Sequence, residues 1–102
     1  MEKFVKFERH EYMDMYPEAH VRTFIADDME GIVNEAKKWA DYMNSNYSGG
    51  TCRFEKVMTA EEAKAHVDSL VDYEKKHWQD DSQEFIDKIT NLYNKCYGQN
   101  SL

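Results

Sequence analysis

No apolar run in this sequence approaches the roughly 20 residues that a membrane-spanning helix needs. Residues 1–8 contain four charged side chains, Glu2, Lys3, Lys6 and Glu8, and lack the apolar core of a signal peptide. Both absences favour a cytoplasmic protein that has no membrane partner.

Motifs of catalysis and of cofactor binding are also missing. The sequence contains no HExxH zinc motif, no GxSxG nucleophile motif and no GxxxxGK[ST] phosphate loop. Gly49 and Gly50 follow a predicted helix and lead into a predicted strand, whereas a phosphate loop leads from a strand into a helix. We therefore expect no catalytic residue, no metal and no cofactor, and we predict that the protein is not an enzyme.

Cysteine and proline are scarce: the sequence contains two cysteines and one proline. Cys52 and Cys96 form no CxxC pair, and each falls on the apolar side of a predicted element. Because disulfides are rare in the cytosol, we expect two reduced and buried thiols. Pro17 cannot donate a hydrogen bond to a sheet, so it marks the turn between the first two strands.

Acidic and aromatic residues are abundant instead. The chain of 102 residues carries 20 acidic residues against 13 Lys and Arg, a formal net charge of -7, and 14% of its residues are aromatic. This length is that of one domain, so we predict a single domain over residues 1–102. A negative field attracts basic partners and opposes the binding of nucleic-acid phosphate, while aromatic side chains supply contact area.

The spacing of apolar residues predicts the order ββαβαα. Strands are expected over residues 3–9, 20–26 and 51–58, and helices are expected to begin at Asp27-Asp28, Thr59 and Asp81. The apolar stripe of the first helix is expected to contain Met29, Ile32, Val33, Ala36, Trp39, Ala40 and Met43. Thr59 and Glu62 match the capping-box pattern. We predict an α+β fold, in which a three-stranded, mostly antiparallel sheet is combined with three helices. A parallel β-α-β crossover over residues 20–58 is the alternative.

Side-chain alternation predicts which residues share a face of the sheet. Val5 and Phe7 of the first strand should point into the core. In the second strand, Val21, Thr23 and Ile25 are expected to do the same, because they alternate with Arg22 and Phe24. In the third strand, Cys52, Phe54 and Met58 are expected on one side. The second face is then predicted to carry these residues: Phe4, Lys6, Arg22, Phe24 and Arg53.

The excess of negative charge is concentrated in one part of the chain. Residues 60–88 contain nine acidic residues and four lysines, a net charge of -5. Glu61, Asp68 and Asp72 share one stripe of the second helix, opposite its apolar side, which is expected to bury Ala60, Ala63, Val67, Leu70 and Val71. We interpret this region as a surface that recognises a basic protein partner, and we call it the acidic surface. Its predicted residues are Glu61, Glu62, Asp68, Asp72, Asp80 and Asp81.

Exposed aromatic residues are predicted to anchor the same contact. Tyr12 and Tyr16 lie in a Tyr- and Met-rich segment, and Tyr73 and Trp78 lie near the end of the second helix. The leading hypothesis is therefore a small acidic protein-binding module. By analogy of size and charge with phage and mobile-element proteins, it would act as an inhibitor or nucleic-acid mimic against a nucleic-acid-binding protein.

Three other hypotheses follow from other features. The Tyr- and Met-rich surface favours a structural or assembly protein that forms homo-oligomers. Aromatic and basic residues on the second sheet face are typical of domains that bind single-stranded nucleic acid. A third hypothesis is a small polar or metal site built from His66, Tyr73 and His77, which line one flank of the second helix.

Overall fold

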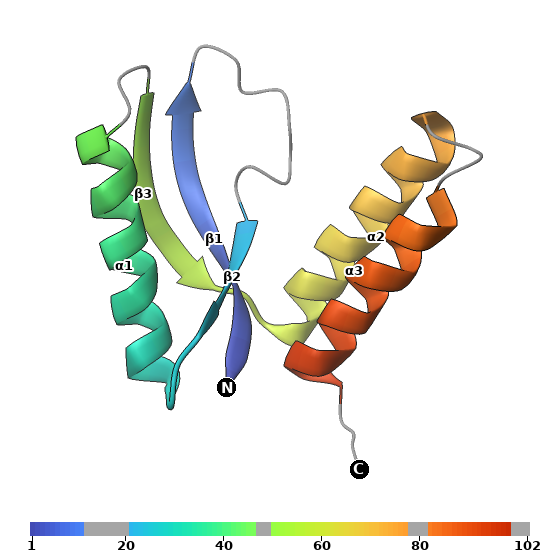
Figure 1. Cartoon of the computed structure of the whole chain (residues 1–102), viewed down its shortest axis with the longest axis horizontal. Coiled ribbons are helices and arrows are strands. Elements are labelled where there is room, and N and C mark those ends of the chain that lie inside the picture. Colours follow the sequence, from blue (N-terminus) through green and yellow to red (C-terminus); the bar gives the residue numbers. More distant parts are fainter. Residues whose placement is uncertain (12–20, 47–49, 78–81, 99–102) are drawn as a thin grey trace. The chain divides into compact units, whose positions relative to one another are not determined.

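A computed structural model of the chain describes residues 1–11, 21–46, 50–77 and 82–98 (Figure 1). Its contacts divide the chain into two compact units, residues 1–58 and 59–102. The elements follow the order ββαβαα, which confirms the predicted α+β class with a three-stranded sheet.

The first unit contains the sheet and one helix. Strand β1 (Glu2–Glu11) lies in the centre, between β2 (Val21–Ile25) and β3 (Gly50–Val57). Both outer strands are antiparallel to β1. The strands β2 and β3 therefore run in the same direction, although β1 separates them and α1 (Met29–Asn46) connects them. The hydrogen-bonded pairs are antiparallel, as predicted, while the connection joins two parallel strands.

The helix α1 covers one face of this sheet, and the core of the unit lies between them (Figure 1). The ring of Phe7 packs 4.8 Å from that of Trp39 and 5.9 Å from that of Phe24, measured between ring centroids. Such contacts add about 0.5–1.5 kcal/mol each to the effect of burial. The fully enclosed members of this core are Val5, Phe7, Ile32, Ala36, Ala40 and Cys52.

The prediction of which side chains of β2 point into the core is wrong. Phe24 is paired with Lys3 and Arg22 with Val5, and residues opposite each other in a sheet point to the same face. Phe24 therefore lies in the core, and the guanidinium of Arg22 stacks 4.7 Å from the centre of the Trp39 ring. Ile25, which was expected on the core side, is exposed.

A β-bulge corrects the prediction for the end of β3. Phe7 is paired with Phe54 but Lys6 with Lys56, so Glu55 is an extra residue in β3. One extra residue reverses the alternation that follows it. Val57 consequently packs against the core beneath α1, whereas Met58 is buried but does not belong to that cluster.

The second unit is a hairpin of two helices that lie side by side and run in opposite directions (Figure 1). Helix α2 (Ala60–His77) buries Ala63, Val67 and Leu70, and α3 (Ser82–Tyr97) buries Cys96. Ala60, predicted to be buried, is exposed. Instead, its carbonyl accepts a hydrogen bond of 3.1 Å from the hydroxyl of Tyr93.

The predicted capping box begins α2. The Glu62 N–H donates to the Thr59 hydroxyl at 3.2 Å, and the Thr59 N–H donates to the Glu62 carboxylate at 2.9 Å. Both cysteines are buried, and neither forms a disulfide. None of the helices in the described part of the chain combines the length and the hydropathy that a membrane span requires.

Candidate functional site

Part of the acidic surface lies on the solvent side of α2. Glu61, Asp68 and Asp72 are exposed, while Ala63, Val67 and Leu70 of the same helix are buried, and the helix packs against α3. The periodicity of an amphipathic helix produces this arrangement, because positions opposite the apolar stripe face water. The structure thus brings these three predicted residues together on one helix.

Lysines of the same helix pair with two of the acids. The Lys64 ammonium lies 2.6 Å from Asp68, and the Lys76 ammonium lies 3.1 Å from Asp72. The two carboxylate side chains remain 60% and 67% exposed. Pairs at this exposure contribute about 0.2–1 kcal/mol, so a partner that offers a better cation can replace the lysine.

Glu62 differs from the other acids of the surface. Its carboxylate accepts the hydrogen bond from the N–H of Thr59 and lies in the first turn of α2. A carboxylate at this position stabilises the helix by capping it and by opposing the helix dipole. We therefore assign Glu62 a structural role and remove it from the residues expected to steer a partner.

Tyr73 presents an exposed aromatic ring on the same helix as these acids. Its side chain is 45% exposed, and its ring stacks on the imidazole of His77 at 4.1 Å between centroids. The His77 Nδ1 also lies 2.9 Å from the carbonyl oxygen of Tyr73. Stacking on one side restricts the Tyr73 side chain, which lowers the entropic cost of ordering it in a contact with a partner.

The remaining predicted anchors and acids lie outside the described residues. They are Tyr12, Tyr16, Trp78, Asp80 and Asp81. Their proposed roles stay predictions.

The structure contains part of the predicted histidine flank. Tyr73 and His77 are in contact, and His66 is half-buried on the same helix. Among the described residues, no group of three or more His, Cys, Asp or Glu side chains is arranged to hold a metal ion. The prediction that the protein is not an enzyme is not tested by this geometry.

The predicted nucleic-acid surface is divided between the two faces of the sheet. Arg22 and Phe24 lie on the side of α1, whereas Lys6 and Arg53 lie on the other side. Both cations of the latter side meet carboxylates, at 3.7 Å for Lys6 with Glu55 and at 2.8 Å for Arg53 with Glu8. The five residues therefore form no continuous platform for bases.

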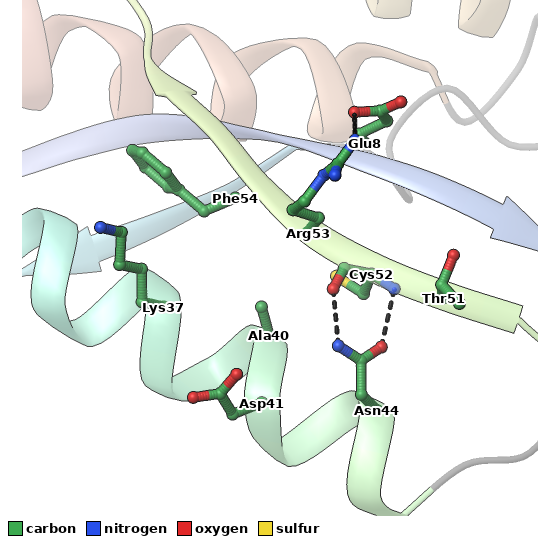
Figure 2. Close-up of a pocket in the computed structure, with 9 residues that line it drawn as sticks. All are labelled: Glu8, Lys37, Ala40, Asp41, Asn44, Thr51, Cys52, Arg53 and Phe54. Atoms are coloured by element: carbon green, nitrogen blue, oxygen red, sulfur yellow. Dashed lines mark hydrogen bonds and ion pairs between the residues drawn. The ribbon is translucent and has the colours of Figure 1, made fainter.

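Sequence reasoning missed a pocket where the outer edge of β3 meets α1 (Figure 2). We call it the edge pocket, and its volume is about 850 Å³. It forms only when α1 folds over the sheet, so no local pattern in the sequence predicts it. Its lining residues are Glu8, Lys37, Ala40, Asp41, Asn44, Thr51, Cys52, Arg53 and Phe54.

Asn44 closes one end of the edge pocket. Its side-chain amide donates to the carbonyl of Cys52 at 2.8 Å, and its amide oxygen accepts from the N–H of Cys52 at 2.7 Å (Figure 2). The side chain thus makes the two hydrogen bonds that another strand would make at this position.

Charged groups of both signs line the rest of the pocket. The ammonium of Lys37 lies 5.8 Å from the centre of the Phe54 ring. The hydrogen bond to Glu8, and then the charge of that carboxylate, raise the pKa of Arg53, so these two charges are paired with each other. The side chain of Asp41 makes no hydrogen bond or ion pair within the described ranges. Asp41 and Lys37 are thus the two charges not neutralised by an opposite charge here.

No protein-family model, curated protein or solved structure matches this chain. Its function must therefore be inferred from its own side chains, and the acidic surface and the edge pocket are the two places where they gather.

Proposed function

We propose that this protein is a small acidic binding module, which engages a basic surface of another protein through α2. The observation that carries the proposal is the exposure of Glu61, Asp68 and Asp72 on one side of that helix. Their carboxylates steer a basic partner, and Tyr73 adds contact area next to Asp72.

The pairing of Asp68 and Asp72 with lysines is compatible with this role. Exposed i, i+4 pairs on a helix are weak, and salt weakens them further. A partner surface rich in arginine forms bidentate hydrogen bonds with carboxylates, which lysine cannot form. The partner class that we propose is therefore a protein with an arginine-rich site, such as a nucleic-acid-binding protein that the module would inhibit.

The test begins with a partner co-purified from the source cell and then prepared alone. We expect its affinity for the module to fall steeply between low and physiological salt, because exposed charges are screened over about 8 Å at about 0.15 M. The double variant Asp68→Lys with Asp72→Lys should bind at least about tenfold more weakly at low salt, because like charges then oppose the contact. Titration calorimetry measures both effects.

A matched control separates the local surface from the net charge. Glu30 and Glu35 are exposed on α1, and Glu35 also pairs with a lysine, at 3.8 Å. The variant Glu30→Lys with Glu35→Lys changes the net charge by the same amount and should keep most of the affinity. Equal losses in the two double variants, or binding that ignores salt, would contradict the proposal.

A further inference from the structure

We propose that the edge pocket binds the free N-terminus of an extended peptide, which adds to β3 as a short parallel strand and carries an acidic second residue. This site lies in the first unit, and it does not depend on the function proposed for α2.

The backbone of β3 provides the pairing surface. Because β3 is an edge strand among the described residues, none of the strands that the structure describes pairs with its outward N–H and C=O groups. Outward groups recur at every second residue of a strand. Since those of Cys52 point outward to Asn44, those of Phe54 point outward as well, into the pocket that Phe54 lines.

Asn44 limits the length of any added strand. Its amide already occupies the outward groups of Cys52, two residues before Phe54. A peptide paired with Phe54 must therefore end before it reaches Asn44. A chain terminus fits this position better than the middle of a chain, which would need to bend away.

Asp41 determines which terminus fits. It lies on α1 one turn before Asn44 and lines the pocket without an ion pair to any described residue. A carboxylate attracts the ammonium of an N-terminus and repels the carboxylate of a C-terminus. A chain that begins near Asn44 must run from Cys52 towards Phe54, which is the direction of β3, so the added strand is parallel.

Lys37 determines the preferred second residue. In parallel pairing, Phe54 donates to the carbonyl of the first peptide residue and accepts from the N–H of the third. The second residue then lies opposite Phe54, and its side chain points to the α1 side, where the Lys37 ammonium lies 5.8 Å from the Phe54 ring. Although Lys37 and Asp41 are four residues apart on α1, no ion pair joins them, so each is available to the peptide.

The experiment is an NMR titration of the full chain with the tripeptide Ala-Glu-Ala, amidated at its C-terminus. We expect shifts of the amide signals of Lys37, Asp41 and Phe54, with a Kd near about 1 mM for so few contacts. N-acetylation of the peptide, or Gln at its second position, should weaken binding at least about threefold, the effect of one exposed ion pair.

Two variants assign the contacts. Asp41→Asn should remove the difference between the free and acetylated peptides but keep the preference for Glu. Lys37→Gln should do the reverse. Lys38→Gln is the control, because Lys38 is an exposed lysine of the same helix that pairs with Glu35 outside the pocket. It should leave both preferences unchanged.

Three results would overturn the proposal. One is the absence of shifts in the edge pocket up to about 10 mM peptide, a concentration that would saturate a millimolar site. Another is equal binding of the free and acetylated peptides by the wild-type protein. The third is a preference for a free N-terminus that persists in Asp41→Asn. None of these results bears on the binding of a basic protein by α2.

Discussion

At the scale of single residues, polar side chains complete the backbone hydrogen bonding of both units. Thr59 and Glu62 cap α2, and Asp28 caps α1 by accepting a hydrogen bond of 2.8 Å from the N–H of Gly31. These contacts are local, so their spacing in the sequence predicts them. The contact of Asn44 with Cys52 spans eight residues and two elements, and it needs α1 to be seated on the sheet.

We predict that Asn44→Ala lowers the free energy of unfolding by about 1–2 kcal/mol. The change leaves the N–H and C=O of Cys52 without their partner at a half-buried edge, which outweighs the better helix propensity of alanine. Urea unfolding followed by circular dichroism measures the loss. Asn34→Ala, at an exposed position of the same helix, should be neutral or slightly stabilising. An equal effect of the two changes would show that the Cys52 contact contributes nothing.

At the scale of elements, the helices were easier to predict than the faces of the strands. The predicted apolar stripe of α1 contains the buried residues Ile32, Ala36 and Ala40, and only Met29 at its start is exposed instead. In β2, both alternating sets contain apolar residues, and only the pairing with β1 decides that Phe24 points inward. In β3, the bulge at Glu55 reverses the alternation, and no residue near it is a glycine or a proline that would have marked it.

The corrected face of β2 leads to a direct prediction. Phe24→Ala should lower the free energy of unfolding by about 2 kcal/mol, somewhat less than for a fully buried ring, because it removes the partner of Phe7 and Trp39. Thr23→Ala, on the opposite face, should cost less than about 1 kcal/mol. Thermal or urea unfolding distinguishes the two. A larger loss of unfolding free energy for Thr23→Ala than for Phe24→Ala would support the original prediction that Thr23 points into the core.

At the scale of the whole molecule, the two compact units raise the question of cooperativity. Within the described residues, the second unit buries only a few side chains, among them Val67, Leu70 and Cys96. A helical hairpin of this size is too small to be stable on its own core. The prediction of a single domain thus requires that both units unfold together.

We expect one cooperative transition for the full chain in urea. The amide signals of Ile32 and Ala36 in α1 should disappear at the same midpoint as those of Val67 and Leu70 in α2, when they are followed by NMR. An earlier midpoint for α2 would mean that the chain consists of two domains. Sedimentation of the same sample tests the hypothesis of self-association, which requires a species larger than a monomer.

The α+β class, the order of the elements, the cap of α2 and the exposed acids of that helix were all predictable from the amino-acid sequence. They depend on contacts between residues close in the chain, whose periodicity is visible in the sequence. The inward face of β2, the bulge in β3 and the edge pocket became apparent in the folded structure alone. These depend on strand register and on how α1 lies over the sheet, and many weak contacts between distant residues determine both.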